Sequence, residues 1–127
     1  MCGRFINTNK VNKLKQIFDI RTNDISIKEN ISYNIAPSNL VNVIINSENS
    51  QIDNIYWGIR LNNQSDSKYQ MLINSRLETI TTKILFKESF YKKRCVVPAN
   101  GWFEWSIKNE IKNPYFIEIS VQETIYF

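Results

Sequence analysis

Residues 94–106 have the sequence RCVVPANGWFEWS, and this stretch decides the fold that we predict. It divides at Asn100 into two short runs rich in valine and aromatic residues, a composition typical of strands. Two more runs of this kind follow at once, NPYFIEIS (113–120) and ETIYF (123–127). Four such segments in quick succession predict a bent, mostly antiparallel sheet of barrel-like shape.

The rest of the chain adds a few helices and more strands to this sheet. Apolar residues recur at helical spacing over 10–19, with Thr8 or Asn9 as the cap, and over 79–93. We expect the second helix to bury four side chains, Ile80, Ile84, Phe86 and Phe90. Further strands are predicted at 40–46, 51–59 and 71–74, and loops at 20–33 and 61–70. The predicted fold class is therefore α+β, with a bent, barrel-like sheet and a few flanking helices.

The length of the chain suits one domain with a sizeable core, and we predict a single domain over residues 1–127. The sequence ends at Ile125-Tyr126-Phe127, inside an apolar strand, and nothing caps that edge. Folded proteins usually protect an exposed strand edge. We therefore expect these residues to form an incomplete domain.

Composition and charge exclude several functional classes. The net charge of +4 is compatible with nucleic-acid binding but is weak evidence for it. Cys2 and Cys95 do not make a disulfide framework, and no signal peptide or membrane-spanning run is present, so we expect a reducing, cytoplasmic setting without a membrane partner. The chain has no histidine, which excludes Ser-His-Asp and Cys-His catalysis within it. We expect neither a metal nor a cofactor, and the oligomeric state stays open.

The N-terminal sequence MCGRF places Cys2 directly after the initiator methionine. Removal of Met1 would leave Cys2 with a free α-amine and a thiol on adjacent carbons. Such a 1,2-aminothiol can condense with an aldehyde to an imine and then close to a thiazolidine ring. The alternative is that Cys2 is a small, semi-buried residue of an N-terminal strand, since free cysteine is often buried.

Three further segments carry polar residues that interrupt the local pattern. In GWFEWS (101–106), aromatic residues flank Glu104, which suits proton transfer or, alternatively, a rim position paired with lysine or arginine. In INSRLET (73–79), Asn74 and Arg76 share a face. They can orient a nucleophile and bind phosphate, or they can simply hydrogen-bond a strand end. YNIAPSN (33–39) predicts a rigid turn around Pro37.

Five segments in this order, MCGRF, YNIAPSN, WGIR, INSRLET and F…RCVVPANGWFEW, resemble the SOS response-associated peptidase (SRAP) family. The resemblance covers residues 1–127 and implies the N-terminal part of the family fold. It implies self-processing removal of Met1, a hydrolase reaction. It also implies lyase-like crosslinking of the cysteine to the ring-opened aldehyde of an abasic site in single-stranded DNA. The partner implied is abasic single-stranded DNA, in the bacterial nucleoid or the eukaryotic nucleus.

The resemblance also implies roles for six residues. Cys2 is the nucleophile, Asn74 positions it, and Glu104 transfers protons in crosslinking and Met1 removal. Arg76 contacts phosphate near the lesion, and Arg4 and Arg94 lie near the DNA path.

One departure from the family pattern leaves two alternative functions open. Family members carry a histidine in their second half that assists Schiff-base chemistry and reversal, whereas this chain has none. We expect crosslinking to tolerate this absence better than reversal does. The alternatives are a DNA-binding remnant with impaired catalysis and a cysteine-type peptidase acting on other proteins. The missing histidine argues against the peptidase, since cleavage by cysteine normally relies on a base partner.

Overall fold

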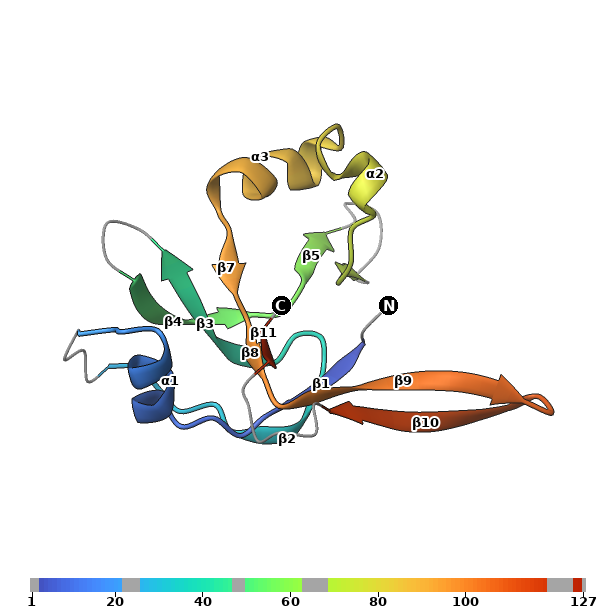
Figure 1. Ribbon diagram of the computed structural model, residues 1–127. Helices are drawn as coiled ribbons and strands as arrows, with labels where there is room; N and C mark the ends of the chain where they lie inside the picture. The colour runs from blue at the N-terminus through green and yellow to red at the C-terminus, as the bar shows by residue number, and fades with distance from the viewer. Residues whose placement is uncertain (1–2, 22–25, 47–49, 63–68, 119–124, 127) are drawn as a thin grey trace.

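The computed structural model describes residues 3–21, 26–46, 50–62, 69–118 and 125–126 (Figure 1). Its helices are α1 (Val11–Ile17), α2 (Leu77–Ile80) and α3 (Ile84–Lys92). The strands that precede α2 are β1 (Arg4–Asn7), β2 (Ser32–Ile35), β3 (Leu40–Asn46), β4 (Ser50–Tyr56), β5 (Ile59–Asn62) and β6 (Tyr69–Leu72). The later strands are β7 (Cys95–Val96), β8 (Pro98–Ala99), β9 (Gly101–Lys108), β10 (Ile111–Glu118) and β11 (Ile125–Tyr126).

Every strand pairing among the described residues is antiparallel, which confirms a mostly antiparallel α+β fold with few helices. The strands form four ladders, in the orders β10-β9-β1-β2, β4-β3-β7, β11-β8 and β5-β6. Within the described part of the chain these ladders do not close into a barrel.

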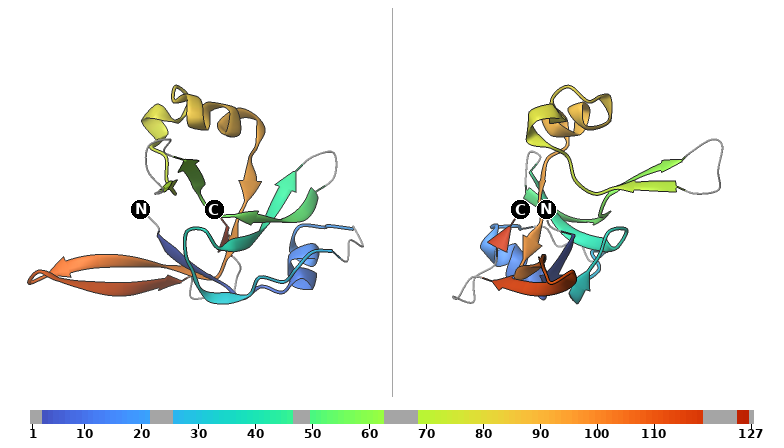
Figure 2. Two further views of the ribbon diagram at one scale, coloured as in Figure 1. Left: turned by 180° about the vertical axis from the view of Figure 1, so that it is seen from behind. Right: turned by 90° about the vertical axis from the view of Figure 1, so that its right-hand side faces the viewer.

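The first ladder places the N-terminal strand between segments from both halves of the chain. β1 pairs with β9 with Arg4 opposite Phe103 and Phe5 opposite Trp102. β9 and β10 form a long hairpin whose turn residues, Asn109 and Glu110, both have positive φ. Positive φ at both central residues matches the right-handed twist of the flanking strands. The hairpin projects from the rest of the molecule in Figure 1 and in the left view of Figure 2.

The core consists of two clusters on the two faces of β3. Alternating side chains of a strand point to opposite faces. Val41 and Val43 therefore pack with one cluster, whose other buried members are Phe5, Ile35 and Ala99. Ile44 packs with the second cluster, whose other buried members are Val11, Leu14, Ile20 and Ile52. Helix α1 supplies Val11 and Leu14, so the spacing of its apolar residues buries one side against the sheet.

Several expected elements need correction. The helix expected over 79–93 is divided into α2 and α3, and Ile84, expected in the core, is 94% exposed. Ile84 is the first residue of α3, and none of that helix's residues is buried. The loop expected over 61–70 is wrong at both ends, because β5 and β6 pair there with Leu61 opposite Gln70. The short strand expected at 71–74 begins earlier, at Tyr69.

The predicted cap of the first helix is also wrong. The helix begins at Val11, and its N-cap residue, Lys10, makes no side-chain capping hydrogen bond. The Val11 N–H instead donates to Glu29 Oε1 at 3.1 Å. A helix leaves its first N–H groups unpaired, and here a carboxylate remote in sequence accepts one of them.

Candidate functional site

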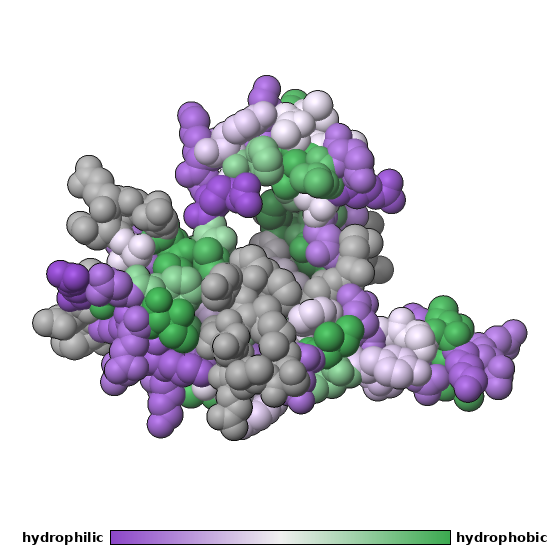
Figure 3. Space-filling view, viewed as in Figure 1, coloured by the Kyte–Doolittle hydropathy of each residue, from purple (hydrophilic) through white to green (hydrophobic). Residues whose placement is uncertain are grey.

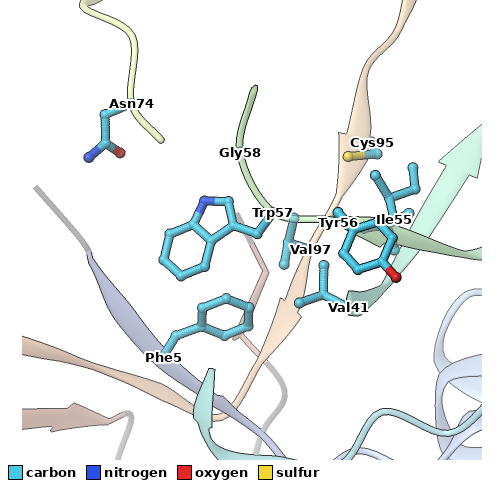
Figure 4. Close-up of a pocket in the computed structure, with 10 residues that line it drawn as sticks. Phe5, Val41, Ile55, Tyr56, Trp57, Gly58, Asn74, Cys95 and Val97 are labelled. Atoms are coloured by element: carbon cyan, nitrogen blue, oxygen red, sulfur yellow. The ribbon is translucent and has the colours of Figure 1, made fainter. Parts of the chain in front are cut away.

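An apolar pocket of about 400 Å³ lies where β1, β3, β7 and the chain after β4 meet (Figure 4). Its lining residues are Phe5, Val41, Val43, Ile55, Tyr56, Trp57, Gly58, Asn74, Cys95 and Val97. The rings of Phe5 and Trp57 meet edge to face with centroids 5.2 Å apart. Trp57 and Trp102 both pack against the core cluster of Phe5. Asn74 is therefore a polar group on a largely apolar wall.

Glu104 lies at the N-terminal end of β1. The β1–β9 ladder ends with Arg4 opposite Phe103, and Glu104 is the next residue of β9. Alternation along β9 places Glu104 on the face of Trp102, which is also the face of Phe5. Glu104 is half-buried there, opposite Tyr115 of β10.

Asn74 lines the same pocket as Phe5 of β1. It follows β6 on the segment that leads into α2, and its side chain is exposed. The N-terminal end of β1 points toward this segment in all three views (Figures 1 and 2). The predicted nucleophile, Cys2, lies outside the described residues. Two of the three predicted catalytic residues thus converge on the strand that leads back to Cys2.

A cluster of asparagine side chains fixes the other end of β1. Asn100 Oδ1 accepts hydrogen bonds from Thr8 N at 2.6 Å and from Thr8 Oγ1 at 3.1 Å. The Asn100 N–H donates to the Ile6 carbonyl at 2.8 Å. Asn7 Oδ1 accepts from both the backbone and the side chain of Asn9 at 3.0 Å. No sequence pattern singles out this cluster, because asparagine is so frequent in the chain that no position stands out.

The predicted turn around Pro37 is confirmed over Ala36–Asn39, although Tyr33–Ile35 belong to β2. The Ser38 N–H donates to the Trp57 carbonyl at 2.8 Å, and the Trp57 N–H donates to the Asn39 carbonyl at 2.9 Å. Ser38 has a φ of 69°, a conformation rare outside glycine and asparagine. The turn thereby holds the backbone of Trp57, and with it one wall of the pocket.

The three predicted DNA-binding arginines occupy separate positions. Arg4 Nη1 donates to Asn34 Oδ1 at 2.8 Å, on the face of β1 opposite Phe5, so the structure does not bring Arg4 into the pocket. Arg76 directly precedes α2 and is exposed. Arg94 follows α3, is exposed, and has its Cζ 5.2 Å from the ring centroid of Phe90. Arg76 and Arg94 therefore flank the helices α2 and α3, which lie at the top of Figure 1.

A second pocket, of about 290 Å³, adjoins the first and was missed by the sequence analysis. Its lining residues are Ser38, Tyr56, Trp57, Gly58, Arg60, Tyr69 and Met71. The Arg60 guanidinium carbon lies 3.8 Å from the centroid of the Tyr69 ring, a cation–π contact. Gly58 has a φ of 106°, and a Cβ there would lie 2.7 Å from Met71 Sδ, so the wall requires glycine. Arg60 directly precedes the segment 61–70 that was predicted as a loop, and Tyr69 lies near the end of that segment.

Cys95 lines the first pocket across from Asn74 (Figure 4). Cys95 is exposed as a residue, but partial burial of its sulfur against the pocket wall raises the pKa of the thiol, and the positive charge of Arg94 partly opposes this effect. A thiol of raised pKa holds less of the nucleophilic thiolate at neutral pH. Cys95 is therefore poorly suited to act as the nucleophile of this site.

No group of three or more cysteine, aspartate or glutamate side chains in the described ranges could hold a metal ion. No helix in those ranges is long and apolar enough to span a bilayer.

Comparisons with known proteins agree on one family. The sequence model of the SOS response associated peptidase (SRAP) family matches residues 1–127. The chain is 34% identical over 123 residues to abasic site processing protein YoaM of Bacillus subtilis, covering 94% of this chain and 54% of YoaM. It is 36% identical over 100 residues to abasic site processing protein HMCES of Xenopus tropicalis, covering 68% of this chain and 30% of that protein.

Solved structures show the same fold. A protein from Bacteroides thetaiotaomicron superposes with a TM-score of 0.73 at 24% identity, over 98% of this chain and 57% of its own. A phage-related protein from Bordetella bronchiseptica gives a TM-score of 0.66 at 23% identity, over 99% of this chain and 58% of its own. The chain spans about half the length of YoaM and of these two structures. On the match over its whole length, the chain belongs to the SRAP family.

Proposed function

We propose that this protein senses abasic sites in single-stranded DNA and crosslinks to them through Cys2. The observation that carries the proposal is the convergence of Glu104 and Asn74 on the N-terminal end of β1, the strand that Cys2 precedes. The names of the relatives, abasic site processing proteins, support the same substrate.

The proposed chemistry begins with hydrolysis of the Met1–Cys2 peptide bond, which consumes one water and frees the α-amine of Cys2. An α-amine titrates near pH 8, so a useful fraction is neutral and nucleophilic at pH 7. The amine adds to the C1′ aldehyde of the ring-opened abasic sugar, and loss of water gives an imine. The Cys2 sulfur then adds to the imine carbon while its proton passes to the nitrogen. The product is a thiazolidine, formed with the net loss of one water.

Glu104 and Asn74 have distinct roles in this scheme. Glu104 donates the proton with which the carbinolamine oxygen leaves as water, and it accepts a proton during Met1 removal. Asn74 is a neutral hydrogen-bonding group beside the same strand end, and it orients the amine or the aldehyde oxygen. The apolar wall of Phe5 and Trp57 limits water at the imine, which disfavours its hydrolysis before the sulfur adds.

The DNA-binding part of the proposal rests on charge and stacking. We assign DNA phosphate contacts to Arg4, Arg76 and Arg94. Such contacts predict that the affinity for DNA falls steeply as the salt concentration rises. Tyr56 and Tyr69 are 67% and 50% exposed around the second pocket, beside Arg60. Aromatic faces next to a cation favour unstacked bases, and this supports a single strand over a duplex.

Intact mass spectrometry tests the proposal. The protein is incubated with a single-stranded oligonucleotide that carries one abasic site, beside the Cys2→Ala variant. We expect a starting mass without Met1 and a heat-stable adduct with the mass of protein plus DNA minus one water, absent in Cys2→Ala. Glu104→Gln is expected to slow adduct formation by about 100-fold or more, since general acid catalysis contributes on that order. Retained Met1 together with no adduct contradicts the proposal.

The same samples separate the alternatives. A binding remnant without chemistry predicts that Cys2→Ala binds abasic DNA as tightly as the unaltered protein and that neither forms a covalent species. A peptidase acting on other proteins predicts cleavage of added peptides, lost in Cys2→Ala. Because the chain has no histidine, we expect the purified crosslink to release its DNA slowly. The matched control for Glu104→Gln is Ser106→Ala, on the same strand and face.

A further inference from the structure

Asn100 lies between β8 and β9 and binds the end of β1 with both its backbone and its side chain. Its N–H donates to the Ile6 carbonyl at 2.8 Å. Its Oδ1 accepts from Thr8 N at 2.6 Å, from Thr8 Oγ1 at 3.1 Å and from Asn9 Nδ2 at 3.3 Å. All three donors to this oxygen come from the two residues that follow β1, so Asn100 ties the end of β1 to the start of β9.

Asn9 is itself held in place within this contact. It is 3% exposed, and both its N–H and its Nδ2 donate to Asn7 Oδ1 at 3.0 Å. Its side-chain amide therefore bridges Asn7 and Asn100. Buried polar networks whose groups find partners make the local structure rigid. We refer to Asn7, Thr8, Asn9 and Asn100 as the Asn100 clamp.

Few other contacts fix the position of β1 along its neighbours. Among the described residues, β1 pairs with β9 over three positions, the last of which sets Ile6 opposite Gly101. Its pairing with β2 carries a register shift between Phe5 and Asn7. A Cβ at Gly3 would meet no heavy atom within 4 Å in the described part of the chain. The Asn100 clamp is therefore the contact that defines how far β1 reaches along β9.

The strand that starts at the clamp also carries the proposed acid. Glu104 lies four residues after Asn100, and from Glu104 onward the described part of β9 pairs with β10 alone. This outer part of the hairpin projects into solvent (Figure 3), so it does not help to place β1. A register slip of one residue would exchange Phe5 and Arg4 between the two faces of β1. The clamp thus decides which residue at the N-terminal end of β1 comes level with Glu104.

We propose that Asn100 is a positioning residue for the N-terminal nucleophile: by holding Ile6 and Thr8 it sets the register of β1 and thereby places Cys2 beside Glu104. The inference rests on the proposed function, because Cys2 is the group that is placed. Asn100 touches no reacting atom and acts through β1. Its side-chain oxygen is the part required, since aspartate supplies the same acceptor whereas leucine, of similar size, supplies none.

Amide hydrogen exchange, resolved by NMR, tests the clamp without DNA. In Asn100→Leu we expect the amides of β1 to exchange at least about ten-fold faster, while the amides of β3 and β4 stay within about two-fold, because only the local opening of β1 becomes easier. Asn100→Asp is expected to restore the slow exchange of β1. Thr8→Val removes one of the hydrogen bonds to Asn100 Oδ1 and should give a smaller acceleration, of about two- to five-fold.

Crosslinking to the abasic oligonucleotide tests the consequence for chemistry. At saturating DNA, Asn100→Leu is expected to form the adduct about 100-fold more slowly, because a misplacement of about 1 Å costs that much. The DNA concentration at half-saturation should stay within about two-fold, since the loss falls on the chemical step. Asn100→Asp should crosslink at close to the unaltered rate. Ile52→Val and Ile52→Ala, in the core cluster beside α1, bracket the loss of stability of Asn100→Leu and should leave the rate unchanged.

Three results overturn the proposal. The first is an unaltered crosslinking rate in Asn100→Leu. The second is a failure of Asn100→Asp to restore both exchange and rate. The third is an equal slowing in the Ile52 variant of matched stability, because Asn100 would then contribute only to stability. If even the unaltered protein forms no adduct, the proposed function fails, and the exchange rates alone decide whether Asn100 sets the register of β1.

Discussion

The helix α1 side of the molecule and the β9–β10 hairpin use the same kinds of apolar residue with opposite results. Beside α1, Leu14, Ile44 and Ile52 are buried between helix and sheet. On the hairpin, Trp105 and Ile107 occupy one face with equal regularity and stay in water. Strand alternation decides which side chains share a face, but only an opposing layer decides whether that face is covered.

This difference predicts where the stability of the isolated chain originates. Burying a large apolar side chain contributes about 1.5–3 kcal/mol, and the two core clusters collect such contributions. The outer hairpin depends on its backbone ladder and on ring contacts such as Phe103 with Phe116, whose centroids are 5.2 Å apart. Truncating a side chain in each region therefore gives very different costs.

The largest expected effect is at the α1 core. Leu14 is fully buried, so Leu14→Ala is expected to lower the free energy of unfolding by about 3–5 kcal/mol through lost burial and the cavity left behind. Ile107→Ala on the hairpin is expected to change it by less than about 0.5 kcal/mol. Urea unfolding followed by circular dichroism measures both. Equal losses in the two variants would show that the hairpin face is already covered.

A smaller effect is expected at the root of the hairpin, where the two regions join. Gly101 is buried, and a Cβ there would lie 2.6 Å from both the Ile117 carbonyl oxygen and the Phe116 ring. Gly101→Ala is therefore expected to destabilise by about 1–3 kcal/mol, as overpacking does. Ser106→Ala, farther along the same strand, is the control and should be near neutral. An unaltered midpoint of urea unfolding for Gly101→Ala would mean that the hairpin is as loosely packed at Gly101 as at its turn.

The comparison also explains what the sequence could predict. The period-two pattern of 101–106 and the hairpin of 40–46 with the strand after it were predictable, because alternation and turn residues act locally. The second strand of that hairpin was predicted over 51–59 but ends at Tyr56. The roles of Glu29 at the start of α1 and of Ser38 against Trp57 depend on contacts between remote segments, which no local pattern contains. The exposure of Ile84 was missed because hydrophobicity was equated with burial.

The candidate site was predictable to a similar extent. The motifs around Asn74 and Glu104 singled out both residues, but only the β1–β9 register placed Glu104 at the end of β1. The roles of both residues stay predictions. The pair of Arg60 and Tyr69 was missed because the polar run 61–70 concealed the strand pairing that brings them together.

The polar cluster behind β1 offers a third comparison of buried with exposed groups. Asn7 is buried, and its Oδ1 accepts two hydrogen bonds from Asn9. Asn7→Ala leaves those donors without this acceptor and is expected to cost about 1–2 kcal/mol. Asn113→Ala, on the hairpin, removes one exposed hydrogen bond to the Ile111 carbonyl and should cost less than about 0.5 kcal/mol. Similar losses for both variants, measured by urea unfolding, would contradict this ranking.

The smallest expected effect is at Cys95, which lies on the wall of the apolar pocket between the covered core and the uncovered surface. Burial raises its pKa in the folded state, so in the Cys2→Ser background alkylation should rise with pH at a higher midpoint than in a short unfolded peptide. Arg94→Ala removes the opposing charge and should move that midpoint higher still. The raised pKa also makes the free energy of unfolding depend on pH. Below the unfolded-state pKa the thiol is neutral in both states, and the stability that the neutral thiol contributes is fully present. This stability is lost as the pH rises through the folded-state pKa. If the pH midpoint of alkylation lies below that of the peptide, the sulfur of Cys95 is fully hydrated. The covered core would then begin only at β3.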